Sequence, residues 1–230
     1  MKNYIIFIIL SSILFISCTE DSTEPSNSST LKIRSSIDKT LLTKGKKAAI
    51  MATNVDSMRI NSFRALISSI KLNDSVEDEN KKLGPFLVGY TIKDGGYEVT
   101  EMSLPEGSYQ KIKFELHKFP GNDWKPYEGD ATFGDFANEK KNTILASGTY
   151  YIKGEAYPFE FETDQTENLS LSFSNPIELK SGTIEEIVLE LTASNLFMNG
   201  DDILPPTAEY QKEIEKNIHH SIVAVKSYTK

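Results

Sequence analysis

The feature that most constrains the fold of this chain is a repeated alternation of apolar and polar residues. It is clearest in residues 112–117, 169–174 and 187–191, where apolar side chains occupy every second position. Successive side chains of a strand point to opposite faces, so the pattern predicts strands with one buried face. We therefore expect an all-β fold, an antiparallel β-sandwich. The residues predicted to be buried are Ile112, Phe114, Leu116, Leu169, Leu171, Phe173, Leu189 and Leu191.

Three further segments complete the expected fold. Residues 149–154 and 159–163 resemble a hairpin that turns around Tyr157 and Pro158. Residues 61–72 are compatible with either a helix or a strand. Residues 207–221 have an apolar residue at every fourth position, which predicts a short C-terminal amphipathic helix packed on the sandwich. The residues of this stripe are Tyr210, Ile214, Ile218 and Ile222.

Cys18, the only cysteine, ends an apolar run over residues 4–16. Lys2 supplies a positive charge before the run, which is shorter than the roughly 20 apolar residues of a transmembrane helix. With Ser17 directly before it, Cys18 resembles the lipobox cysteine of bacterial lipoproteins, which is lipidated and becomes the mature N-terminus. Alternatives are an uncleaved anchor and a secretory signal with an incidental cysteine. We expect a lipid-anchored membrane protein.

The segment after Cys18 is polar up to Thr30 and predicts a flexible tether. Its acidic pair Glu20 and Asp21 resembles the signal that exports lipoproteins of the Bacteroidota to the cell surface; a plain solvated linker is the alternative. The expected organisation is a signal peptide over residues 1–17, a lipidated cysteine and tether over 18–30, and a single β-sandwich domain over 31–230. The expected location is the outer membrane, with the domain exposed at the surface.

Composition excludes some partners. The chain has 33 Asp and Glu against 25 Lys and Arg, a formal charge of −8. This charge argues against nucleic-acid binding, which depends on basic residues. Because Cys18 is the only cysteine, no internal disulfide is expected, so stability should come from burial and hydrogen bonding.

Catalytic motifs are missing from the sequence. Cys18 is taken by lipidation, and the chain has no Gly-x-Ser-x-Gly nucleophile motif. The histidines are His117, His219 and His220; the last two are adjacent, which suits a shared metal ion poorly. His117 is interpreted as a solvated residue on the polar side of its strand. We expect neither an enzyme nor a cofactor.

The best candidate binding site is the long connection between Phe119 and Ile144, because loops of this length are often functional. Trp124 and Tyr127 could stack on a sugar or anchor a protein partner. The alternative is that Trp124, Phe133 and Phe136 fold back over the open end of the sandwich. The candidate ligand-binding residues are Trp124, Tyr127, Asp123, Glu128 and Asp130.

Two acidic clusters are weaker candidates. Residues 199–202, Asn-Gly-Asp-Asp, contain oxygen ligands suited to calcium, but too few of them, and the motif is more typical of a tight turn. Residues 74–79 are interpreted as a solvated hairpin tip.

Several stretches together resemble a family of lipoprotein domains without known activity from the Bacteroidota and related bacteria. The clearest are Leu-Pro-Glu-Gly-Ser-Tyr over residues 104–109, Asn-Pro-Ile over 175–177 and Asn-Leu-Phe-Met-Asn-Gly-Asp over 195–201. The resemblance implies a transthyretin-like or immunoglobulin-like β-sandwich in an outer-membrane lipoprotein. The expected function is a non-catalytic binding or interaction module for a protein or glycan. The alternative is a structural subunit of a fimbria-like or envelope assembly, in which one protein completes another's sheet.

Overall fold

The computed structural model describes residues 28–45, 53–74, 85–91 and 95–227. Cys18, most of the predicted tether and the acidic cluster after Asp74 lie outside these residues. The strands are β1 (Ser28–Ile37), β2 (Leu41–Thr43), β3 (Ser57–Asp74), β4 (Phe86–Thr91), β5 (Gly95–Pro105), β6 (Gly107–Leu116), β7 (Ile144–Ile152), β8 (Glu155–Thr163), β9 (Glu167–Leu179), β10 (Ile184–Leu191), β11 (Met198–Asn199), β12 (Asp202–Ile203) and β13 (Ile222–Ser227). The helices are a 3₁₀ turn (Lys125–Tyr127), α1 (Ala193–Phe197) and α2 (Gln211–Ser221).

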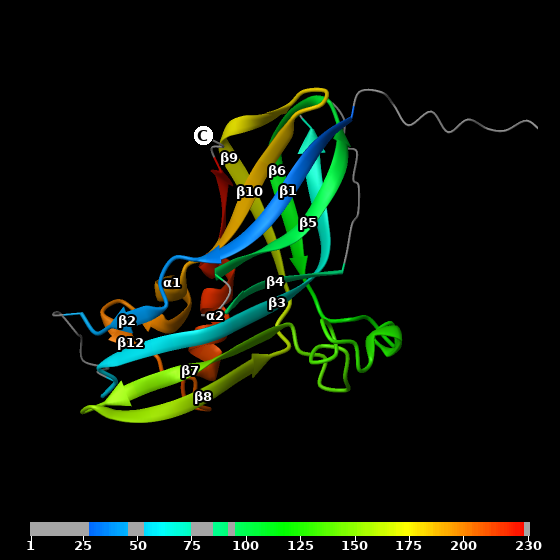
Figure 1. The fold of residues 1–230 in the computed structure, drawn as a ribbon. Coiled ribbons are helices and arrows are strands. Elements are labelled where there is room, and N and C mark those ends of the chain that lie inside the picture. The colour runs from blue at the N-terminus through cyan, green and yellow to red at the C-terminus, as the bar shows by residue number, and fades with distance from the viewer. Residues whose placement is uncertain (1–27, 46–52, 75–84, 92–94, 228–230) are drawn as a thin grey trace, which may run out of the picture.

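The fold is an all-β sandwich, as the alternation predicts (Figure 1). The strands other than β11 and β12 form one continuous sheet that folds into two layers. One layer has the strand order β13-β10-β1-β5, the other contains β4-β3-β6-β9 with β2, β7 and β8, and pairing of β5 with β4 joins them. The ladders are antiparallel except that β1 runs parallel to β10, with Thr30 opposite Ile184. Alternation cannot distinguish the two directions, because side chains alternate in both kinds of ladder.

β3 organises the second layer because it is long enough to pair with four strands. On one edge β3 pairs with β2 over residues 57–59 and with β4 over residues 62–67. On the other edge it pairs with β7 over residues 57–65 and with β6 over residues 67–74. Figure 1 shows β3 running across the molecule from the β7–β8 hairpin to the upper sandwich. Residues 61–72, ambiguous in sequence, are therefore a strand.

The main core fills the space between the layers. It includes Ile33 of β1, Ile70 of β3, Phe114 of β6 and Leu189 of β10, each at most 1% exposed. Of the residues predicted to be buried, Leu171 and Phe173 are only partly buried. Phe173 lies in an irregularity of β9, because Ser172 pairs with Lys111 and Ile177 with Tyr109, so the residues between them leave the regular ladder. Leu171 pairs with Ile112 in the regular part of the ladder.

The helices cover the inner side of the β7–β8 region. Phe197 of α1 lies 6.1 Å, between ring centroids, from both Phe159 and Phe161 of β8. Ile214 and Ile218 of α2 are buried, which confirms the predicted C-terminal amphipathic helix. Tyr210 precedes the first helical residue and Ile222 begins β13, so the helix is shorter than the apolar stripe.

Two predicted boundaries are wrong. The β7–β8 hairpin turns at Lys153 and Gly154, which have positive φ angles of 51° and 83°, and Pro158 lies within β8. β8 tolerates proline because β7 is its one partner among the described strands, so the other edge needs no amide donor. At the N-terminus, β1 begins at Ser28, inside the predicted tether. Ser29 is buried and its hydroxyl donates a 3.1 Å hydrogen bond to the Leu104 carbonyl.

Candidate functional site

The long connection between β6 and β7 leaves the sheet and returns to almost the same place. β6 ends with Leu116 opposite Ile67 of β3, and β7 begins with Ile144 opposite Ala65. Residues 117–143, called here the aromatic loop, therefore form a long excursion whose two ends are neighbours. β6 before the aromatic loop and β7 after it both pair with β3.

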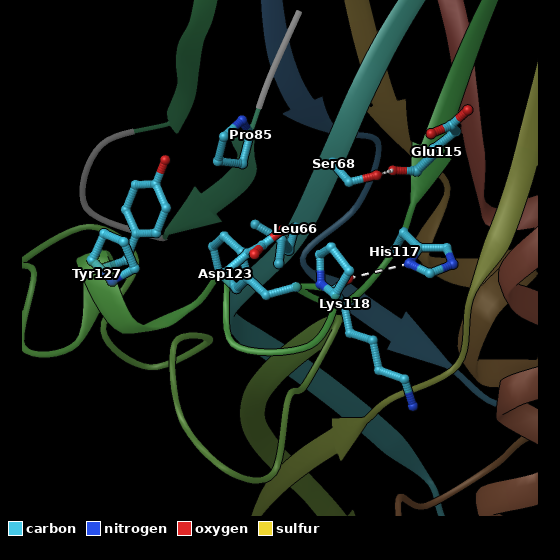
Figure 2. Close-up of a pocket in the computed structure, with 11 residues that line it drawn as sticks. Leu66, Ser68, Pro85, Glu115, His117, Lys118, Asp123 and Tyr127 are labelled. Atoms are coloured by element: carbon cyan, nitrogen blue, oxygen red, sulfur yellow. Dashed lines mark hydrogen bonds between the residues drawn. The ribbon is translucent and has the colours of Figure 1, made fainter.

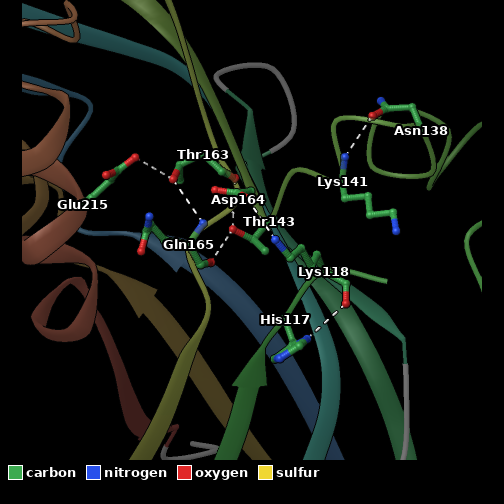
Figure 3. A network of polar contacts seen from close by, with 9 residues as sticks. All are labelled: His117, Lys118, Asn138, Lys141, Thr143, Thr163, Asp164, Gln165 and Glu215. Carbon is green, nitrogen blue, oxygen red and sulfur yellow. Dashed lines mark hydrogen bonds and ion pairs between the residues drawn. The ribbon is translucent and has the colours of Figure 1, made fainter. Parts of the chain in front are cut away.

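Thr143 fixes the point where the aromatic loop returns (Figure 3). Its backbone N–H donates to the Thr163 carbonyl at 2.7 Å, and its carbonyl accepts from Leu66 N–H at 2.8 Å. Its hydroxyl lies 3.0 Å and 2.6 Å from the carbonyl oxygens of Thr163 and Gln165. The hydroxyl of Thr163 in turn donates to Glu215 of α2 at 2.9 Å. These bonds join the loop end to β8 and to the C-terminal helix.

The aromatic loop folds back onto the outer face of β3 and builds a second hydrophobic cluster there. The alternative interpretation of Trp124, Phe133 and Phe136 is therefore right about folding back, but the covered surface is the outer face of the sheet and not the open end of the sandwich. Trp124 is half-buried. The buried members of this outer cluster are Leu66, Phe119, Phe136 and Ala137, and Leu87, Trp124, Tyr127, Phe133 and Leu145 pack partly buried around them.

Ring contacts hold the outer cluster together. Tyr127 stacks on Phe119 with ring centroids 5.1 Å apart and meets Phe133 edge-on at 5.2 Å. Arg64 of β3 lies over Phe136 at 5.6 Å and donates a 2.6 Å hydrogen bond to Asp135. Such aromatic and cation–π contacts each contribute about 0.5 to 1.5 kcal/mol. Tyr127 is therefore a structural residue of the loop as well as a candidate for ligand contact.

The predicted acidic residues have different roles. Asp130 accepts hydrogen bonds from the backbone N–H groups of Thr132 and Phe133, at 2.8 Å and 2.9 Å. These bonds, first that from Phe133, lower the pKa of the Asp130 carboxyl below its usual value. Glu128 is exposed. Asp130 thus stabilises the loop conformation, and Asp123 alone among the predicted acids lines a cavity.

That cavity has a volume of about 550 Å³ and lies between the aromatic loop and the sheet (Figure 2). Its size is in the range of small-ligand sites, roughly 300 to 1,000 Å³. It brings together Asp123 and Tyr127 of the prediction but not Trp124, Glu128 or Asp130. Its lining residues are Leu66, Ser68, Pro85, Glu115, His117, Lys118, Phe119, Pro120, Asp123, Pro126 and Tyr127.

Most charged groups of this cavity already have partners. Glu115 pairs with Lys71 at 2.9 Å, and Lys118 pairs with Asp164 at 2.9 Å. The Ser68 hydroxyl donates to the Glu115 carbonyl at 3.2 Å, and Nδ1 of His117 lies 3.1 Å from the Lys118 carbonyl. Among the described residues, Asp123 has no hydrogen bond or ion pair through its carboxylate.

A second hollow, about 520 Å³, lies on the other side of the loop base. It contains the Arg64–Asp135 pair and the Lys140–Glu162 pair, both with 2.6 Å contacts. The hydrogen bond from Lys140 lowers the pKa of the Glu162 carboxyl. Because these charges neutralise each other, we consider this hollow a weaker candidate for ligand binding.

The other candidates have structural roles. Residues 199–202 make the turn between β11 and β12, where Gly200 has a φ of 60°. Asp202 is buried and lies 3.4 Å from the Lys44 ammonium. Nδ1 of His219 lies 3.4 Å from the Glu167 carboxylate. Within the part of the chain that the structure describes, no group of three or more His, Cys, Asp or Glu side chains could hold a metal ion.

Comparisons of the chain with known protein families, with characterised proteins and with solved structures found no significant match. The resemblance to Bacteroidota lipoprotein domains therefore stays a prediction from the sequence. No helix in the described ranges is long and apolar enough to cross a membrane.

Proposed function

We propose that this protein is a non-catalytic binding module, anchored in the outer membrane through a lipid on Cys18 and displayed at the cell surface. Its ligand site is the cavity beneath the aromatic loop. The observation that carries the proposal is this cavity of about 550 Å³, which has a largely apolar wall and polar residues at its rim. The aromatic loop forms one side of it and the sheet forms the other.

The position of the cavity relative to the chain start supports the proposal. β1 begins at Ser28, opposite Pro105 at the end of β5, and β6 starts two residues later at Gly107. β6 then runs for 10 residues, roughly 30 Å, to the cavity residues beyond Glu115. The stretch from Cys18 to Ser28 reaches at most about 35 Å. A lipid on Cys18 would thus hold the Ser28 end near the membrane and let the cavity face outward.

The alternative, an assembly in which another protein adds a strand to this sheet, is less well supported by the edge strand β8. β8 pairs with β7 and with no other described strand. Its exposed positions include Pro158, Glu160 and Glu162, residue types that oppose pairing with another strand. A binding module therefore remains the better proposal.

The proposal is tested in cells that produce the full chain with a photo-crosslinking benzoylphenylalanine in place of Pro126, which lines the cavity. The matched control carries it in place of Pro158, which is exposed on β8. We expect an adduct of defined mass from position 126 and none from position 158. Equal adducts, or no adduct from position 126, would contradict the assignment of the site.

The anchor is tested separately with Cys18→Ser. Cells supplied with radioactive palmitate should label the wild-type protein and leave the variant unlabelled. Persistent labelling of the variant would refute lipidation at Cys18. Protease treatment of intact cells then reports the side of the membrane, and protection of the domain would contradict surface display.

A further inference from the structure

The wall of the cavity beneath the aromatic loop suits an apolar group. Leu66 and Phe119 form part of it, and Pro85, Pro120 and Pro126 supply rigid apolar surface around it. Tyr127 completes this side, since its ring is fixed by stacking on Phe119. Burial of an apolar side chain here would contribute about 25 cal/mol for each Å² removed from water.

One negative charge at the rim of the cavity has no neutralising partner in the described part of the chain. The rim cation Lys118 forms an ion pair with Asp164, and the rim carboxylate Glu115 forms one with Lys71. Lys141, from the end of the loop, donates to the Gly121 carbonyl at 2.7 Å. Lys125 is exposed and does not line the cavity. Asp123 is left as a lining carboxylate without a partner among the described residues.

Figure 2 shows Asp123 between Tyr127 and Lys118, while the Lys118 side chain extends away from it. A ligand seated against Tyr127 and the prolines would therefore meet a negative charge at its edge. In a protein with a formal charge of −8, the surrounding field strengthens the preference for a cationic ligand.

We propose, on the basis of the binding function above, that the cavity receives a peptide segment of a partner protein. The segment inserts an apolar or aromatic side chain between Tyr127 and the proline wall. A neighbouring Lys or Arg of the partner pairs with Asp123. Apolar anchors in pockets with charges at the rim are the usual arrangement of protein interfaces.

A saccharide fits these residues less well. Sugar hydroxyls need several hydrogen-bonding side chains that are available to the ligand. Here the Ser68 hydroxyl, the Glu115 carboxylate and the Lys118 ammonium already bond to other groups of the protein. Few polar groups remain for a sugar, and most of the wall is hydrocarbon.

The test uses the full-length protein in detergent micelles, immobilised and screened with a random heptapeptide phage library. We expect enriched peptides to contain an apolar or aromatic residue beside Lys or Arg. Synthetic peptides from this selection are then titrated against wild type, Asp123→Asn and Glu128→Gln. Glu128 is the matched control, an exposed carboxylate of the same loop that does not line the cavity.

Asp123 is exposed, so Asp123→Asn should weaken peptide binding roughly two- to fivefold, the effect of one solvent-accessible ion pair, and Glu128→Gln should leave binding nearly unchanged. Absence of enrichment, enriched peptides without basic residues, or equal effects of the two charge changes would overturn the inference. Binding of chitotetraose or cellotetraose in place of peptides would also overturn it, yet leave the binding function intact if the crosslink at position 126 persists.

Discussion

Phe136 offers the sharpest test of how the aromatic loop is held. Its side chain is 0% exposed at the centre of the outer cluster, next to Arg64. Phe136→Ala should destabilise the loop by about 3 to 5 kcal/mol, the usual cost of truncating a buried aromatic residue. The main core lies on the opposite face of β3 and is built from other residues, so it should keep most of its stability.

The assay is urea unfolding followed by two signals. Trp124, the only tryptophan, reports the loop, and far-ultraviolet circular dichroism reports the sheets. With an m-value of about 2 kcal/mol per M, Phe136→Ala should move the Trp124 transition down by roughly 2 M and the dichroism transition much less. The control Phe114→Ala, in the main core, should move both together. Coincident transitions in Phe136→Ala, or an unchanged Trp124 transition, would refute the idea that the loop is a separately stabilised unit.

Three further tests address other parts of the structure. Leu116→Ala should lower the free energy of unfolding by about 2 to 5 kcal/mol, because Leu116 is buried. Glu115→Ala should lower it by about 1 kcal/mol or less, because Glu115 belongs to a half-exposed ion pair. Equal costs in denaturant unfolding would contradict the register of β6. Thr143→Val should cost about 1 to 3 kcal/mol in the same assay by removing a buried hydroxyl bonded to two carbonyls, and an unchanged midpoint would contradict this anchor. The Asp130 carboxyl has a lowered pKa in the folded loop, so the stability it contributes is present above the unfolded pKa of about 4 and lost as pH falls through the folded value. Trp124 fluorescence of the wild type should show this acid transition, and Asp130→Asn should remove it.

The sequence predicts the strands that have one solvated face. β6 and β10 alternate cleanly, because their outward positions face water or the cavity rim, and their inward residues Ile112, Phe114, Leu189 and Leu191 are buried as predicted. The alternation of apolar and polar residues is lost where both faces of a strand are covered. In β3 the consecutive residues Ala65, Leu66 and Ile67 are all buried, the middle one by the aromatic loop and the others by the main core. Three adjacent apolar residues fit a helix as well as a strand, which explains the ambiguity.

The candidate site was only partly predictable. Loop length and aromatic content pointed to residues between Phe119 and Ile144, and Asp123 and Tyr127 do line the cavity. The sequence indicates only a solvated position for His117, because nothing in the spacing of this strand shows that a later segment folds back beside it. The opposite wall, from Leu66 and Pro85, depends on pairing between strands distant in sequence. Such long-range contacts leave no local pattern.

The same geometry explains how the sandwich accommodates so long an excursion. The loop leaves opposite Ile67 and returns opposite Ala65, so its ends are held close together by β3 whatever the loop does between them. The entropy of closing a loop grows only slowly with length, by about 0.6 kcal/mol for each doubling. The outer cluster around Phe136 then offsets the cost of ordering the segment. The aromatic loop can therefore change in sequence on the outer face of the sheet while the main core, on the inner face, keeps its own contacts.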